Sequence, residues 1–190
     1  MADMDFNRDV KFFQSISWAR ILLDDPAYLT IPTPSRIYKK STEDAVIAET
    51  LNTKDTIKAW LTMYKKPAVG DTLITESRTL LSLGHGVNGY PGLVHGGIMG
   101  LMIDEAMGIM LQLNAYAAKM DSTTLVVTAY LKTTFLRPAP TPSIILLTTK
   151  LREHKERKMY VDATIENEAG DVLATGEALF IRAKEPQPKL

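Results

Sequence analysis

The stretch from Leu93 to Leu113 has the hydrophobic periodicity of a buried helix. Its apolar residues recur about every 3.6 positions, and this spacing predicts a helix over about 95–115. Because the helix is apolar on almost every side, we expect it to be buried. Two adjacent carboxylates, Asp104 and Glu105, interrupt the apolar run. A buried carboxylate is costly unless it is paired, protonated or facing a cleft, so this acidic pair indicates a functional site.

Segments on both sides of this helix have the residue types of β-strands. One such segment precedes the helix and four follow it, over residues 73–83, 123–136, 144–154, 159–166 and 172–182. The run from Asn167 to Asp171 is typical of a hairpin turn. A long buried helix among these strands requires an antiparallel sheet wrapped around it, which predicts an α+β fold.

In the first part of the chain, the sequence pattern predicts helices joined by an extended connector. Residues 5–23 have the apolar stripe of an amphipathic helix that ends before Pro26, and residues 26–41 predict the connector. Ser41 is typical of a helix cap, for a helix that ends near Leu51. A second short helix is predicted over 56–64, from an apolar face made of Ile57, Trp60, Leu61 and Tyr64.

We therefore expect a helical N-terminal extension over 1–66, a second domain over 67–184 and a frayed tail over 185–190. The extension carries Phe12, Phe13, Trp18 and Trp60. This is too much apolar surface to remain in water, so we expect the extension to be folded rather than disordered.

The composition excludes several classes of function. Lys and Arg together number 22, as do Asp and Glu, so a net charge of zero gives no attraction to nucleic acid or an anionic membrane. There is no cysteine, which excludes disulfides and a cysteine nucleophile, and the three histidines are too scattered to predict a metal site. The acidic N-terminus is unlike a signal peptide and no run approaches the ~20 apolar residues of a membrane span, so we expect a cytoplasmic protein.

Three motifs over about residues 70–182 resemble those of one known family. The first is Val94-His95-Gly96-Gly97 with Asp104 nine residues after the histidine, and the second is the run from Thr133 to Pro138. The third is the closing pair of strands, 161–165 and 170–180. Together they resemble the hotdog-fold acyl thioesterases, in the branch of the phenylacetate-degradation and mammalian small acyl-CoA thioesterases. The resemblance implies the hotdog fold, an antiparallel sheet wrapped around a long central helix.

The resemblance also implies a catalytic site. Asp104 matches the carboxylate that acts as the nucleophile or as the general base for water, and Gly96 matches the glycine whose backbone N–H polarises the thioester carbonyl. His95 matches the histidine beside that glycine. Thr128 lies ten residues before Pro138, where the family often has a Ser or Thr that orients the water or the carboxylate.

Four further residues are candidates for substrate binding. Some family members have an Asn six residues before the histidine, where this chain has Gly89 with Asn88 beside it. Gly97 shares the helix N-terminus, whose free N–H groups suit a developing oxyanion. Arg137 could meet a phosphate of coenzyme A, and Met99 lies on a methionine-rich face that suits an adaptable acyl pocket. The resemblance implies neither a metal nor a cofactor.

Helix geometry predicts a shared active site. Gly96 and Asp104 lie eight residues apart on one helix, so they are separated by about 12 Å at 1.5 Å per residue. Attack on a carbonyl requires both groups within about 3–4 Å of the same carbon. Two antiparallel copies of the helix would bring Gly96 of one beside Asp104 of the other, which predicts a homodimer or a tetramer built from it. The substrate is expected to be an acyl thioester of coenzyme A or of a carrier protein.

Two other functions compete with thioester hydrolysis. The run Asp104-Glu105-Ala106-Met107 loosely resembles the helix of the fatty-acid dehydratases, in which a Glu precedes Ala-Met. That class also needs a histidine about fourteen residues upstream of the Glu, where this chain has Pro91. The second alternative is a non-hydrolytic hotdog protein that binds a ligand or shapes a product in a biosynthetic pathway. In the thioesterase interpretation, Glu105 is a structural or solvent-side carboxylate.

Overall fold

The computed structural model describes residues 2–117 and 126–183, the first four of them by their backbone alone. One antiparallel sheet has the strand order β1-β2-β3-β7-β8-β9-β6. Its strands are β1 (Tyr28–Ile31), β2 (Ile57–Lys65), β3 (Glu76–Leu83), β6 (Val126–Phe135), β7 (Ser143–Lys155), β8 (Lys158–Glu166) and β9 (Val172–Arg182). The predicted α+β hotdog architecture is confirmed. Residues 123–125 of a predicted strand and the predicted tail, 185–190, lie outside the described residues.

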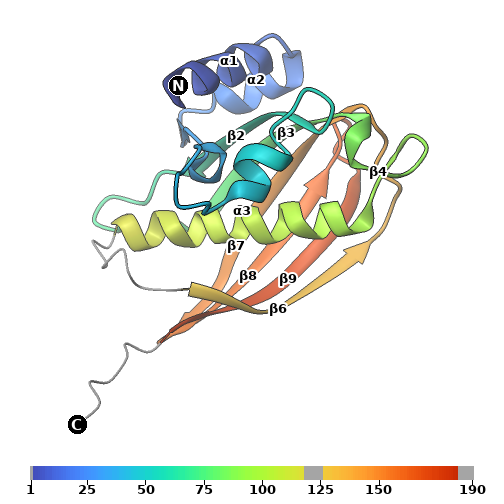
Figure 1. Ribbon diagram of the computed structural model, residues 1–190. Helices are drawn as coiled ribbons and strands as arrows, with labels where there is room; N and C mark the ends of the chain where they lie inside the picture. The colour runs from blue at the N-terminus through green and yellow to red at the C-terminus, as the bar shows by residue number, and fades with distance from the viewer. Residues whose placement is uncertain (1, 118–125, 184–190) are drawn as a thin grey trace.

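The remaining elements lie on the two faces of this sheet or at its ends (Figure 1). The helices are α1 (Ala2–Gln14), α2 (Ser17–Leu23) and α3 (Gly96–Ala117), with helical turns η1 (Pro34–Arg36), η2 (Val46–Thr50) and η3 (His85–Val87). The short strands β4 (Asn88–Tyr90) and β5 (Leu93–Val94) form a separate ribbon just before α3. The predicted helix 95–115 therefore corresponds to α3 within two residues at each end.

The sheet wraps around α3, which is the long green-to-yellow helix in Figure 1. Eight α3 side chains are buried, and Met102, Ile103 and Met107 are almost completely excluded from solvent. The helix approaches β9 closely at Gly176, where an added Cβ would lie 2.5 Å from Ile103 Cγ2. A side chain at position 176 would push α3 away from the sheet, so glycine is required there by close packing.

By length and composition, α3 would also suffice to cross a membrane. The expectation that no run approaches a membrane span is wrong in this respect. The core helix of a globular domain has the same length and apolarity, and α3 packs against β3, β6, β7, β8 and β9. Its apolar character is therefore weak evidence for a membrane segment.

The N-terminal helices α1 and α2 cover part of the opposite face of the sheet (Figure 1). Phe13 and Ala19 are buried there against Leu61, Met63 and Leu80 of β2 and β3. Farther along the sheet the same face is polar, with Arg152 of β7 paired to Asp162 of β8 and Glu177 of β9, and Lys132 of β6 also paired to Glu177. The outer face is thus apolar where the helices cover it and charged beyond them. This arrangement agrees with the expectation of a folded extension, although the boundary at residue 66 stays a prediction because β2 pairs with β3 across it.

Two predicted helices of the extension are wrong. Residues 57–65 form strand β2, in which Trp60 packs toward α3 while Ala59 and Leu61 pack toward the N-terminal helices. A strand buried on both faces has no polar alternation, so its apolar residues also match a helical spacing. Ser41 does not cap a helix, because Thr42 and Asp44 have positive φ angles of 67° and 59°, which an α-helix excludes. Helical structure in that region is confined to Val46–Thr50.

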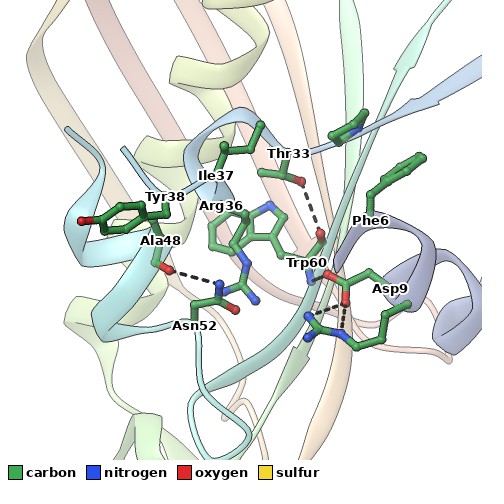
Figure 2. A pocket seen from close by; sticks show the side chains of 11 residues that line it. Phe6, Asp9, Thr33, Arg36, Ile37, Tyr38, Ala48, Asn52 and Trp60 are labelled. Atoms are coloured by element: carbon green, nitrogen blue, oxygen red, sulfur yellow. Dashed lines mark hydrogen bonds and ion pairs between the residues drawn. The ribbon is translucent and has the colours of Figure 1, made fainter. Parts of the chain in front are cut away.

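Side chains from the extension seal the part of β2 that β1 leaves unpaired. β1 pairs only with residues 62–65 of β2. Beyond it, Asp9 accepts a hydrogen bond from the Trp60 N–H at 3.1 Å, Thr33 donates to the Trp60 carbonyl at 3.3 Å, and Arg36 donates to the Ile57 carbonyl at 3.0 Å. Figure 2 shows Asp9 and Thr33 converging on Trp60 at the edge of a cavity of about 520 Å³. These contacts satisfy backbone groups that an open sheet edge would expose.

Replacing Asp9 with Ala should lower the free energy of unfolding by about 1–3 kcal/mol, because the buried Trp60 N–H loses its acceptor. Asp9 is only 4% exposed, so water does not readily replace the carboxylate. The measurement is urea denaturation followed by tryptophan fluorescence. Asp24→Ala, at an exposed carboxylate of the same extension, is the control and should change stability by less than about 0.5 kcal/mol. Equal effects of the two substitutions would contradict this account of the β2 edge.

Candidate active site at the N-terminus of the central helix

Backbone hydrogen bonds hold the segment that leads into α3. The His95 N–H donates to the Val87 carbonyl and the Val94 N–H to the Ala139 carbonyl, each at 2.9 Å. The Thr141 N–H donates to the Gly92 carbonyl, also at 2.9 Å. These bonds connect the start of α3 to the loop before it and to the segment after β6. The position of His95 is therefore fixed by two parts of the chain that are remote in sequence.

The first turn of α3 leaves one backbone donor free. The Gly97 N–H donates to His95 Nδ1 at 2.9 Å, while the Ile98 and Met99 N–H groups donate to the His95 carbonyl at 3.0 and 3.1 Å. Within residues 2–117 and 126–183, no acceptor takes the Gly96 N–H. This N–H lies at the positive end of the helix dipole, where a developing negative charge is stabilised. Of the two candidate glycines, Gly96 is the one whose N–H is available to a ligand.

The same geometry assigns the tautomer of His95. Since Nδ1 accepts the Gly97 N–H, Nδ1 carries no proton in the neutral ring, and the proton is on Nε2. The ring is exposed, so its Nε2–H is available to a substrate or to water. His95 thus supports the helix start through one nitrogen and presents a donor with the other.

Asp104 and Thr128 lie together, as the family pattern predicts. The Thr128 hydroxyl donates to Asp104 Oδ1 at 2.9 Å, from strand β6 to helix α3. The register of β6 shifts between Thr128 and Tyr130, and bulges of this kind often redirect a side chain near a functional site. Thr128 is exposed and Asp104 is half-buried. Asp104 Oδ1 is therefore held by Thr128, and no residue within 2–117 and 126–183 bonds Oδ2.

Strand β6 runs along α3 between these two groups. An added Cβ at Gly96 would lie 3.2 Å from Phe135 Cζ, and one at Gly100 would lie 3.7 Å from Thr133 Oγ1. Thr128, Thr133 and Phe135 thus follow the helix from Asp104 back to Gly96. In the sequence, Phe135 stands out only as part of the motif from Thr133 to Pro138, which does not indicate its place beside Gly96. Phe135 lies two residues after Thr133, so the two side chains share a face of the strand. This spacing is the feature of the sequence that could have indicated that Phe135 faces α3.

Close packing explains the departure from the family pattern at residue 89. A Cβ added at Gly89 would lie 3.0 Å from both Cα and Cδ2 of His95, so an Asn does not fit there without moving the histidine. Asn88, beside it, accepts a hydrogen bond from the Thr141 hydroxyl through Oδ1. Asn88 therefore ties the loop before α3 to the segment after β6.

The structure does not bring every candidate to this site. The Arg137 guanidinium donates to the Val172 carbonyl at 2.8 Å and is exposed beyond the end of β6. Met99 is 3% exposed and belongs to the core cluster around α3. The roles assigned to both residues in substrate binding stay predictions.

Glu105 faces a different part of the molecule from Asp104. Burial raises the pKa of the Glu105 carboxyl, and the carboxylates of Asp44 and Asp104 raise it further. The Ser35 hydroxyl and the Lys39 ammonium act in the opposite direction. These neighbours place Glu105 against residues 35–44 of the N-terminal extension, whereas Asp104 faces β6.

Comparisons with known proteins agree with this fold, and the matched residues include α3. Residues 91–174 match the family model of the thioesterase superfamily. The chain is similar to the acyl-coenzyme A thioesterase THEM4 of Mus musculus, with 31% identity over 116 residues that cover 60% of this chain and 46% of that protein. The chain thus spans about half the length of the curated relatives it matches.

Solved structures show the same fold. A thioesterase superfamily protein is 29% identical, with a TM-score of 0.50, over 63% of this chain and 55% of that chain. A hypothetical thioesterase protein from Streptococcus pneumoniae, solved with coenzyme A, is 12% identical with a TM-score of 0.52, over 60% and 82% of the two chains. The chain therefore has the hotdog fold, and its residues 91–174 match the thioesterase superfamily, which its sequence motifs resemble.

Proposed function

We propose that the protein hydrolyses an acyl thioester of coenzyme A, with Asp104 and the Gly96 N–H as the groups that carry the reaction. The observation behind this proposal is the pairing of one free N–H at the positive end of α3 with a carboxylate that Thr128 holds in place. These are the two elements that acyl transfer requires, an oxyanion donor and a base or nucleophile. The acyl-coenzyme A thioesterase among the relatives and the related structure with coenzyme A support this substrate class.

In the proposed reaction, the thioester carbonyl oxygen accepts the Gly96 N–H, which stabilises the negative charge that develops there. Asp104 attacks the carbonyl carbon or removes a proton from the attacking water through Oδ2, the oxygen that Thr128 does not bond. Thr128, by donating to Oδ1, fixes the orientation of the carboxylate. The carbon–sulfur bond then breaks, the coenzyme A thiol leaves with a proton, and the net addition of water yields the carboxylic acid.

The site is proposed to form between two protomers. About 12 Å of helix separates Gly96 from Asp104, which is too far for one carbonyl to reach both. Strand β6 is at the edge of the sheet and exposes apolar side chains. On the strand these side chains are Val127, Tyr130 and Phe135, and Leu136 follows directly after it; each is 44–55% exposed. An exposed apolar edge beside a half-built site favours a two-fold dimer in which α3 and β6 meet their copies.

The dehydratase alternative needs Glu105 as the reacting carboxylate. Its neighbours from the extension, Ser35, Lys39 and Asp44, place it away from the Thr128 hydroxyl that holds Asp104. This arrangement favours Asp104. The non-hydrolytic alternative and the cytoplasmic location stay predictions.

Asp104→Asn should lower turnover of acyl-CoA thioesters by at least about 10²-fold, because it removes the base or nucleophile while keeping the shape of the side chain. Glu105→Gln, at the adjacent residue, is the matched control and should have a much smaller effect. Release of free thiol from a panel of acyl-CoA thioesters measures both, with circular dichroism to verify the fold. The reverse order of effects would favour the dehydratase interpretation.

Glu105→Gln should stabilise the protein at pH 7. A carboxyl whose pKa is raised by folding contributes stability below its unfolded pKa of about 4.3, and this contribution is lost as the pH rises through the folded pKa. The uncharged amide avoids that loss, so the urea midpoint of the variant should exceed that of the wild type at pH 7. The gain should disappear near pH 4. A constant difference across this pH range would show that burial of the charge is not its cause.

Mixing two inactive variants should restore activity if the site is shared. Asp104→Asn removes the carboxylate, and Gly96→Pro removes the N–H at a helix position that tolerates proline. Unfolded and refolded together in equal amounts, about half of the dimers are mixed, and each contains one intact site. Activity should therefore return to about a quarter of the wild-type value.

Gly96→Ala is the control for this experiment. It introduces the same Cβ beside Phe135 but keeps the N–H, so it should retain more activity than Gly96→Pro. Activity that stays near zero at every mixing ratio, with subunit exchange verified by native mass spectrometry, would refute the shared site.

A further inference from the structure

Phe135 is the side chain that lies against the free donor of the proposed site. Its Cζ is 3.2 Å, and its Cε1 and Cε2 are 3.6 and 3.7 Å, from the point where a Cβ at Gly96 would lie. The tip of the ring therefore touches the residue whose N–H is unoccupied in the described part of the chain. A side chain at Gly96 would press on the tip of this ring, which would have to shift by a few tenths of an ångström.

The position of the ring is set by β6 rather than by the hydrophobic core. Leu131 packs against the core and Thr133 faces Gly100, so the alternation of the strand brings Phe135 to the helix side as well. Lys132 lies on the opposite face, where it pairs with Glu177. Directly after Phe135, the Leu136 N–H donates to the Leu173 carbonyl at 2.8 Å and fixes the end of the strand.

Despite this fixed position, Phe135 is 55% exposed. A phenylalanine used only for packing is normally buried, because its hydrophobic contribution depends on the area removed from water. The ring is thus held at the start of α3 with more than half of its surface open to a ligand or to a second protomer.

A thioester bound at Gly96 would bring its acyl group to this ring. The carbonyl oxygen would lie about 2.9 Å from the Gly96 nitrogen. The acyl substituent of the carbonyl carbon can then reach the aromatic ring that lies beside the same glycine. Bulk at the carbon next to the carbonyl would collide with the ring, whereas a straight chain can pass it.

We propose that Phe135 is a specificity-determining residue that selects acyl groups unbranched at the carbon next to the thioester carbonyl. Because it belongs to the Gly96 half of the site, it acts on the substrate that Asp104 of the other protomer attacks. This inference rests on the proposed thioester hydrolysis and its shared site. It adds a residue to which the sequence motifs assign no role.

The first test measures kcat/KM for pairs of straight-chain and α-branched acyl-CoA thioesters of equal carbon number, such as butyryl-CoA and isobutyryl-CoA. In Phe135→Ala the ratio of branched to straight should rise by at least about tenfold, the scale on which pockets discriminate one carbon. If the wild-type protein hydrolyses acyl-CoA thioesters but Phe135→Ala leaves the ratio of branched to straight unchanged, the role of Phe135 is overturned and the proposed function is not. A wild-type protein that hydrolyses no thioester would overturn the proposed function and this inference together.

The second test uses the mixed dimers, in which the surviving site takes Gly96 from the Asp104→Asn subunit and Asp104 from the Gly96→Pro subunit. Phe135→Ala on the Asp104→Asn subunit should change the acyl preference of that site. The same substitution on the Gly96→Pro subunit should leave the preference unchanged and is the matched control. Equal effects of Phe135→Ala on the two subunits would indicate a role in dimer packing. An effect only on the Gly96→Pro subunit would place Phe135 beside Asp104 of the same protomer. Either outcome would overturn the proposal.

Discussion

The burial of α3 against the inner face of the sheet is the interaction on which the site depends. Gly176 allows the helix to approach β9 so closely that Ile103 fills the space of a missing side chain. With Ile103 fixed against β9, the adjacent residue Asp104 is presented to β6, where Thr128 meets it. The same rigid helix sets the distance between Asp104 and Gly96. Packing in the core therefore determines the geometry of the chemistry at the surface.

The N-terminal extension completes the fold on the other side of the sheet. Its helices bury the apolar outer residues of β2, β3 and β7, while Asp9, Thr33 and Arg36 satisfy the backbone of β2 where no strand pairs with it. The extension also reaches α3 itself, since Ser35, Lys39 and Asp44 lie near Glu105. Of the two adjacent carboxylates, Glu105 thus lies against the extension, and Asp104 lies in the proposed site.

At the opposite edge of the sheet, no described strand pairs with the outer side of β6. Strand β6 has a free edge and exposed apolar side chains, and it lies along the part of α3 that carries both Gly96 and Asp104. The proposed dimer would both complete the site and cover the exposed edge of β6. In that arrangement each site takes a carboxylate and a threonine from one protomer, and a glycine and an aromatic ring from the other.

The sequence alone determined the long helix, the four strands after it and the resemblance to the thioesterases. The reason is that a helix apolar on every side and strands separated by turn residues leave periodic signals in the chain, and His95, Gly96 and Asp104 keep a fixed spacing. Only the tertiary structure decided that 57–65 is a strand, because burial on both faces removes the alternation that identifies one. It also decided which N–H of the first turn stays free and which carboxylate faces β6. Those outcomes depend on hydrogen bonds and contacts between residues that are distant in sequence, such as His95 with Val87, Asp104 with Thr128 and Gly96 with Phe135.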